Sequence, residues 1–315
     1  MESAKFRESV HKAVLLHEVV DGLVPKERQK TGTLKRTNVY LDGTLGGAGH
    51  ALAIAKALDG KLDVIVGLDR DQLALDRAKI TLKNQSKNLI LQNENFRNLD
   101  SVLSKHQISK VDIILLDLGI SSDELDNSDR GFTFQKDEPL LMTMGDPEKY
   151  PFTAKDIVNK WDEEVIANII FGYAEEKFAR RIARAIINYR LKKQIESTME
   201  LAELVKISVP GFYRRGRIHP ATKTFQALRI AVNDELGALK EGLRKGYEVL
   251  NKGGRFAVIS FHSLEDRIVK EFFKEKLNDE AIIITKKPIT AKEQEILENP
   301  RSRSAKLRIL EKTKL

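Results

Sequence analysis

Short apolar segments alternate with amphipathic ones in the first 120 residues, and this alternation constrains the fold more than any other feature. Runs of Val, Ile and Leu with the length of single strands occur at 39–41, 62–68, 89–91 and 111–118. Between them, apolar residues recur with helical spacing at 51–58, 72–82 and 99–106. Strands that are joined by helices pair in parallel, so this part of the chain predicts a doubly wound α/β sheet.

The strand pattern stops between about residues 124 and 217, where amphipathic helical patterns appear at 163–171, 174–191 and 198–207. It resumes after a long helical stretch, 222–250, with a buried strand at 255–261 and two further strand candidates, 281–286 and 305–310, which would pair antiparallel. We therefore predict a seven-stranded, mainly parallel sheet in a core made of 1–125 and 216–315. A mostly helical insertion would occupy 126–215.

Composition excludes several kinds of chemistry. The chain has no cysteine, which rules out disulfides, cysteine-ligated zinc, iron–sulfur clusters and a thiolate nucleophile. The net charge of +8 would attract a polyanion, although scattered Lys and Arg are equally typical of a solvated surface. No segment approaches the roughly 18 apolar residues of a membrane span, so we expect a cytoplasmic protein with no membrane partner.

A glycine-rich turn follows the first predicted strand, in Val39-Tyr-Leu-Asp-Gly-Thr-Leu-Gly-Gly-Ala-Gly-His50. Gly46, Gly47 and Gly49 would let the backbone approach a ligand closely, although an ordinary strand–helix turn has the same pattern. Leu52 replaces the third glycine of a dinucleotide fingerprint, and the phosphate-binding Walker pattern is missing. The turn therefore suits S-adenosylmethionine, which has no phosphate, better than a dinucleotide.

The second and third predicted strands end in further candidate cofactor ligands. Asp69 lies 20 residues after Gly49, where a carboxylate can accept hydrogen bonds from both hydroxyls of an adenosine ribose. Asp71 is the competing candidate, with a surface or helix-capping position as its alternative. Phe96 is placed to cover an adenine, but a Phe at a strand end is more often part of the core.

The fourth predicted strand ends in Asp117-Leu-Gly-Ile-Ser-Ser122, beside the first strand and at the switch point where such sheets bind ligands. Methylation of an exocyclic amine needs acceptors that draw the N–H protons away while the nitrogen approaches the methyl group in line. Asp117 and nearby carbonyls would supply them. The Asp/Asn-Pro-Pro-aromatic turn of many amine methyltransferases is missing, and cytosine C5 methylation would require a cysteine.

Several motifs in this order resemble the bacterial 16S rRNA cytosine-N4 methyltransferase family (MraW type), across nearly the whole chain. They are His11-Lys-Ala-Val-Leu-Leu16, the glycine turn, Asp117-Leu-Gly-Ile-Ser-Ser122, Arg130-Gly-Phe-Thr-Phe134, His219-Pro-Ala-Thr-Lys-Thr-Phe-Gln-Ala-Leu-Arg229, Ser260-Phe-His-Ser-Leu-Glu-Asp-Arg267 and Asn299-Pro-Arg-Ser-Arg-Ser304.

The resemblance implies a class I methyltransferase (Rossmann-like) fold with an inserted, mostly helical substrate domain. It implies S-adenosylmethionine as cofactor and, as substrate, the N4 of a cytidine in the decoding region of 16S rRNA within the small ribosomal subunit. No metal site is expected, and the oligomeric state stays open between monomer and homodimer. The implied catalytic residue is Asp117, and the implied cofactor contacts are Gly47, Ala48, Gly49, His50, Asp69, Phe96, Asp117 and Glu124.

The chain departs from the family at a few positions. The family usually has glycine where Ala48 stands and glutamine where Glu124 stands. In Pro139-Leu-Leu-Met-Thr-Met144, Leu141 and Thr143 replace an acidic and a basic residue. If that charge pair only braces the insertion, function survives. If it positions the substrate, activity or the choice of target has changed. The second hypothesis is a non-catalytic ribosome-assembly factor that keeps the fold but has lost turnover through changes such as Leu141, Thr143 and Glu124. An NAD-dependent oxidoreductase would leave the carboxyl-terminal motifs unexplained.

Basic residues provide the candidate RNA contacts. Loop residues 214–217 follow Phe212 and Tyr213, aromatic side chains that would stack on an unpaired base. The basic stretch 180–193 has a competing interpretation, because glutamates can pair with its arginines along one helix face. For His262 a structural role is equally consistent with the sequence. The substrate candidates are Arg214, Arg215, Arg217, His219, His262, Arg301 and Arg303.

Overall fold

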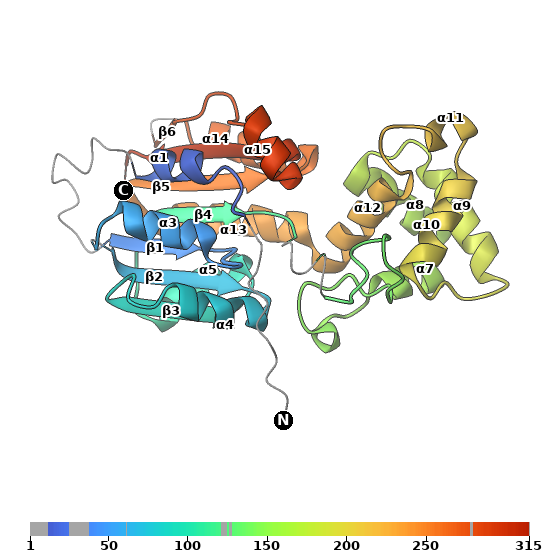
Figure 1. Cartoon of the computed structure of the whole chain (residues 1–315), viewed down its shortest axis with the longest axis horizontal. Coiled ribbons are helices and arrows are strands. Elements are labelled where there is room, and N and C mark those ends of the chain that lie inside the picture. The colour runs from blue at the N-terminus through green and yellow to red at the C-terminus, as the bar shows by residue number, and fades with distance from the viewer. Residues whose placement is uncertain are drawn as a thin grey trace. The chain divides into compact units, whose positions relative to one another are not determined.

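The computed structural model describes residues 12–24, 38–60, 62–120, 125, 128–277 and 280–314. The chain divides into two compact units (Figure 1). The sheet unit comprises Met1–Gly119 and Leu236–Leu315, and the helical unit comprises Ile120–Glu235. None of the described helices is long and apolar enough to cross a membrane.

The sheet unit contains one seven-stranded sheet in the order β3-β2-β1-β4-β5-β7-β6 (Figure 1). The first five of these run parallel, and β7 lies antiparallel to both of its neighbours. This order, with a reversed seventh strand, is that of the class I methyltransferase fold, so the predicted fold class is confirmed. The strands are β1 (Asn38–Asp42), β2 (Leu62–Asp69), β3 (Asn88–Asn93), β4 (Val111–Asp117), β5 (Leu250–Ser260), β6 (Ala281–Ile283) and β7 (Lys306–Lys312).

Helices cover both faces of this sheet, because its strands carry apolar side chains on alternate faces. Tyr40 and Ile113 belong to one buried cluster together with side chains of α1 (Leu16–Leu23), α3 (Gly49–Ala57) and α4 (Gln72–Thr81). Leu41 and Ile114 belong to another, with α5 (Leu99–Lys105), α13 (Glu235–Val249) and α14 (Ser263–Glu275). Because both faces of the sheet are buried, the sequences of its strands are nearly continuous runs of apolar residues.

The helical unit has its own hydrophobic core, to which Ile157, Ile170, Ile182, Leu201 and Leu228 contribute. The helical character predicted for this part of the chain is confirmed. Its helices are α7 (Ala154–Lys160), α8 (Glu163–Ala174), α9 (Ala179–Arg190), α10 (Thr198–Ser208), α11 (Gly211–Arg214) and α12 (Ala221–Asn233).

The prediction of one long helix over 222–250 is wrong. Asp234 adopts a left-handed conformation with φ of 45°, which ends α12 before α13 begins. Phe225 and Leu228 of α12 are buried in the core of the helical unit, so this helix does not belong to the sheet unit. The predicted insertion, 126–215, is accordingly shorter at both ends than Ile120–Glu235.

Asn233, the last residue of α12, holds an irregular segment that precedes α7. Its Oδ1 accepts a hydrogen bond from the Met144 N–H at 2.9 Å, and its Nδ2 donates to the Met142 and Arg229 carbonyls at 2.7 and 2.9 Å. The departures Leu141 and Thr143 lie in this segment. Thr143 is fully buried, and its hydroxyl donates to the Gly145 carbonyl at 3.2 Å. Thr143, which stands where the family has a basic residue, therefore has an uncharged hydrogen-bond partner, the Gly145 carbonyl, within the helical unit.

We expect Asn233→Ala to lower the free energy of unfolding by about 2–4 kcal/mol, because it leaves a buried N–H and a buried carbonyl without partners. Urea unfolding followed by circular dichroism measures the change. Thr222→Ala, at an exposed position near the start of the same helix, is the matched control and should change stability by less than about 0.5 kcal/mol. Equal stability of both variants would contradict the bracing role of Asn233.

Candidate active site

The glycine-rich turn leads from the end of β1 into α3. It is fixed by hydrogen bonds from the Leu45 N–H to the Leu68 carbonyl at 2.9 Å and from the Ala48 N–H to the Leu45 carbonyl at 2.8 Å. Gly46 and Ala48 both have positive φ, 51° and 63°. The family's usual glycine at position 48 has a physical reason, since glycine adopts this conformation without strain. Gly47, Gly49 and His50 lie in this turn or at the start of α3.

Asp69 lies at the end of β2, beside the turn. Its Oδ2 accepts a hydrogen bond from the Gly46 N–H at 2.7 Å, and its Oδ1 accepts one from the Asp71 N–H at 2.9 Å. Burial raises the pKa of this carboxyl. Asp71 caps α4 by accepting a hydrogen bond from the Leu73 N–H at 3.0 Å, which is the capping role considered as its alternative. Each Asp69 oxygen keeps a lone pair that can accept a hydrogen bond from a ribose hydroxyl. The ribose contact itself stays a prediction.

Phe96 opens a short 3-10 helix, η1 (Phe96–Asn98), directly after β3. Its ring packs so closely on α13 that a Cβ at Gly242 would lie 2.5 Å from ring atom Cδ2. The side chain is half-buried against the core cluster on this face of the sheet. Phe96 therefore packs against the core, close to its alternative interpretation, and its contact with an adenine stays a prediction.

Asp117 ends β4, next to β1. Its backbone N–H donates to Oγ1 of Thr44 at 2.6 Å, and its Oδ2 lies 3.6 Å from Nδ1 of His50. The side chain is 15% exposed, yet Oδ1 is buried and has no hydrogen-bond partner in the part of the chain that the structure describes. An unpaired buried acceptor is costly unless something else occupies it.

The His50 ring is held from its other side, since Nε2 lies 2.9 Å from the Val14 carbonyl oxygen. A carbonyl only accepts, so Nε2 carries the proton and, in the neutral ring, the Nδ1 lone pair faces Asp117. This geometry fixes the tautomer of His50. In the neutral ring, Nδ1 can take a proton from Asp117.

Several carboxyl groups gather at this edge of the sheet, and their mutual repulsion changes their acidity. Burial raises the pKa of Asp117 well above its usual range, and the negative charges of Asp42 and Glu265 raise it further. Burial also raises the pKa of Asp42 to about 6, against the lowering effect of a hydrogen bond from the Tyr40 hydroxyl at 2.6 Å. The sequence reasoning gave Asp42 no role. Its position at the end of the first strand, directly before the glycine turn, was the available signal.

His262 and Glu265 form a capping box at the start of α14. Glu265 is buried, and its Oε2 accepts hydrogen bonds from the Phe261 and His262 N–H groups at 2.8 and 3.4 Å. Nδ1 of His262 accepts from the Glu265 N–H at 3.4 Å. The structural role considered for His262 is therefore the one the structure shows, and an RNA contact at His262 stays a prediction.

The predicted RNA-binding residues belong to both units, and their local roles differ. The Arg214 guanidinium donates to the Ile207 and Val209 carbonyls at 2.7 and 2.9 Å and so caps α10. Arg215 and Arg217 are exposed and have no acidic partner among the described residues. The His219 ring lies against Phe134, with 4.7 Å between centroids. In the sheet unit, Arg301 and the exposed Arg303 lie in η3 (Pro300–Ser304), and Glu124 falls outside the described residues.

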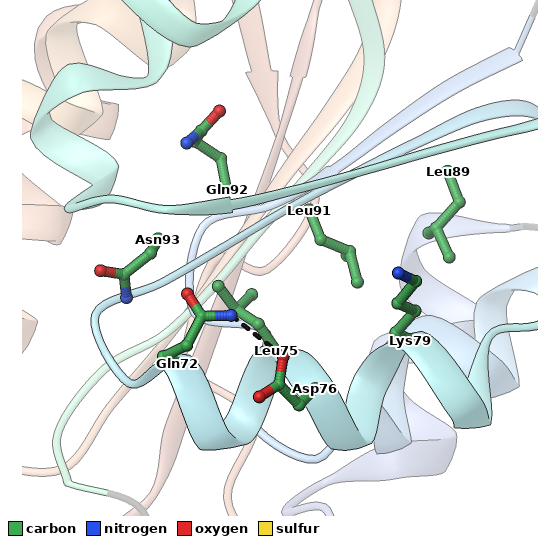
Figure 2. A pocket seen from close by; sticks show the side chains of 8 residues that line it. All are labelled: Gln72, Leu75, Asp76, Lys79, Leu89, Leu91, Gln92 and Asn93. Carbon is green, nitrogen blue, oxygen red and sulfur yellow. Dashed lines mark hydrogen bonds between the residues drawn. The ribbon is translucent and has the colours of Figure 1, made fainter.

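A groove of about 460 Å³ lies between α4 and the edge strand β3 (Figure 2). Leu75, Leu89 and Leu91 form its apolar side, and Asn93 at one end donates to the Asp69 carbonyl at 3.1 Å. β2 and β1 separate it from β4 in the sheet, so it does not include Asp117. In the described ranges, no three His, Asp or Glu side chains are grouped so that they could hold a metal ion.

Comparison with known proteins agrees with this geometry. Residues 8–313 match the model of the MraW methylase family. The chain belongs to the MraW methylase family. The ribosomal RNA small subunit methyltransferase H of Acetivibrio thermocellus is 46% identical, over 96% of this chain and 98% of its own length. That of Brevibacillus brevis is 44% identical over the same shares.

One solved structure is similar over 96% of this chain and 98% of its own, the rRNA methylase from Streptococcus thermophilus, with 12% identity and a TM-score of 0.43. For this MraW-family protein, the fold assignment rests on the strand order of its own sheet.

The raised pKa of Asp42 predicts a pH-dependent stability. The folded carboxyl has a pKa of about 6 and the unfolded one 3.8, so the unfolded chain releases its proton first and stability falls as pH rises through this window. Asp42→Asn removes this penalty. We expect its stability relative to the parent to improve by on the order of 2 kcal/mol between pH 4 and pH 7.

Chemical unfolding of parent and variant at both pH values measures the difference. Asp59→Asn, at an exposed position with left-handed φ that asparagine tolerates, is the control and should follow the parent at each pH. A constant difference between Asp42→Asn and the parent at the two pH values would show that Asp42 titrates normally.

Proposed function

We propose that this protein transfers the methyl group of S-adenosylmethionine to the exocyclic N4 of a cytidine in the decoding region of 16S rRNA. The observation that carries this proposal is the Asp117 carboxyl, which ends β4 beside the glycine turn and has one buried oxygen without a partner. Membership of a methylase family supports methyl transfer. Relatives that are named ribosomal RNA small subunit methyltransferase H support the RNA substrate.

The residues around the turn fit S-adenosylmethionine. The positive φ at Gly46 keeps the turn tight, and both Asp69 oxygens still have acceptor capacity for a ribose. When bound, the cofactor supplies an electrophilic methyl group on a sulfonium. The residues that would hold it are Gly47, Ala48, Gly49, His50, Asp69, Phe96, Asp117 and Glu124, with Asp69 at the ribose and Phe96 beside the adenine.

Asp117 acts on the acceptor amine. Its unpartnered Oδ1 accepts an N–H hydrogen bond from N4, which draws the proton away and reduces the conjugation of the nitrogen lone pair with the ring. N4 must lose one proton when it gains a methyl group. The raised pKa of Asp117 favours its taking that proton, and the Nδ1 lone pair of His50 is the next acceptor.

Cytidine N4 also agrees with what the chain lacks. Methylation at cytosine C5 proceeds through a cysteine that adds to the ring, and the chain has no cysteine. We propose that the exposed arginines Arg215, Arg217 and Arg303 contact phosphates of the RNA within the small ribosomal subunit. The proposed activity on ribosomal RNA supports a location in the cytoplasm, where these subunits are assembled.

We expect Asp117→Asn to reduce formation of N4-methylcytidine at least 100-fold, because an amide oxygen accepts a hydrogen bond but cannot take the proton. The assay incubates purified protein with small ribosomal subunits that lack the modification and with labelled S-adenosylmethionine. The RNA is then digested, and mass spectrometry identifies the methylated nucleoside.

Asp112→Asn is the matched control, since Asp112 lies at the other end of the same strand and accepts hydrogen bonds from Val39 and Asn251. It should keep activity wherever it keeps the fold. A parent protein that binds the cofactor but forms no methylated nucleoside would instead support the non-catalytic assembly factor. Methylation at another atom would contradict the assignment to N4.

A further inference from the structure

A buried carboxylate organises the turn between α8 and α9. Glu176 is fully buried, and its Oε1 accepts a hydrogen bond from the Phe178 N–H at 2.8 Å. Its Oε2 accepts a hydrogen bond from the hydroxyl of Tyr213 in α11. Burying a carboxylate is costly unless hydrogen bonds compensate for the lost water. Here one oxygen binds the α8–α9 turn and the other binds α11, so Glu176 joins two segments that are far apart in the sequence.

Three aromatic rings meet where these segments are joined. The Phe178 ring centroid lies 4.9 Å from that of Tyr213 and 6.3 Å from that of Phe212, with edge-on geometry in both pairs. Phe178 is half-buried, whereas Phe212 is 64% exposed. The Phe212 ring thus lies against the half-buried Phe178 ring while most of its surface stays open to water.

A lysine completes the group. Nζ of Lys177 lies 5.3 Å from the Phe178 and Tyr213 centroids and 5.9 Å from the Phe212 centroid. Lys177 is exposed, and no carboxylate pairs with it among the described residues. Lys177, Phe178, Phe212 and Tyr213 are called the aromatic–lysine cluster below. Arg215, which is exposed and has no carboxylate partner among the described residues either, lies two residues after Tyr213 in the sequence.

We infer that the aromatic–lysine cluster is a stacking platform for an unpaired RNA base, with Phe212 against the base and Lys177 beside its phosphate. The inference rests on the proposed function for its RNA substrate. Single-stranded nucleic acid is bound by combining aromatic faces with cations that follow the backbone, which is the combination present here. A base inside a helix is already stacked on its neighbours, so the preferred ligand is a loop or an unpaired strand.

The chemistry of the surface favours RNA over a protein partner. Phe212 is the one strongly exposed ring of the cluster, and the adjacent exposed groups Lys177 and Arg215 are cationic. An apolar protein interface would call for a wider hydrophobic patch than one ring. Arg214, which the sequence suggested as a phosphate contact, donates to carbonyls at the end of α10, so Lys177 and Arg215 are the cations beside Phe212.

The test measures the affinity of the full-length protein for a fluorescently labelled, unstructured 12-nucleotide RNA by anisotropy. We expect Phe212→Ala to weaken binding about tenfold and Phe212→Trp to preserve it, because one stacked base is lost in the first variant and kept in the second. Lys177→Gln should reduce the slope of log affinity against log salt by about 0.7. Phe171→Ala is the matched control, since Phe171 is 62% exposed in α8 of the same unit, and should bind like the parent.

Equal affinity of the parent and Phe212→Ala would overturn the inference, as would the same loss in Phe171→Ala. Stronger, Phe212-dependent binding of a labelled poly-glutamate would reassign the platform to an acidic protein. Methyl transfer to small subunits is measured in parallel. Failure of the proposed function appears as absence of methylated nucleoside with the parent, whereas failure of this inference appears as RNA binding that does not depend on Phe212.

Discussion

The hydrogen bond from the Asp117 N–H to Oγ1 of Thr44 joins the exits of β4 and β1, which are 73 residues apart in the sequence. Because β1 and β4 are parallel neighbours, the chain leaves both strands at the same edge of the sheet. This bond therefore holds the start of the glycine turn next to the end of β4. The Thr44 N–H also donates to Asp42 at 3.1 Å. Asp42, Thr44 and Asp117 are therefore held in one arrangement, and the carboxyl that faces His50 gets its position from it.

The same arrangement has an energetic cost. Burial raises the pKa of Asp42 and of Asp117, which means that the folded chain holds their negative charges less well than water does. The Tyr40 hydroxyl and the Thr44 N–H compensate Asp42, but Oδ1 of Asp117 has no such donor among the described residues. A fold that needed only stability would place apolar or neutral side chains here.

How far the sequence predicts this structure depends on whether the deciding signal is local. The strands and most helices follow from apolar periodicity, and Asp117 and Asp69 follow from their places at strand ends. The break at Asp234 does not, because the apolar pattern continues through it and only a left-handed φ separates the two helices. Arg214 and Arg215 look alike in sequence, yet Arg214 caps α10 and Arg215 has no partner within the part of the chain that the structure describes. That difference depends on carbonyls that only the folded α10 presents.

The two described departures from the family with a clear local environment, Ala48 and Thr143, bear on the choice between an enzyme and an assembly factor. Ala48 keeps the left-handed turn, with φ of 63°, at a strain of about 1 kcal/mol relative to glycine. Thr143 is buried and satisfied within the helical unit. Neither change removes Asp42, Thr44 or Asp117. A protein that only bound RNA would gain nothing from carboxyl groups buried together, since their negative charge repels phosphate. The proposed role of Asp117 in proton transfer would explain why the fold tolerates this cost, and this favours the enzyme over the assembly factor.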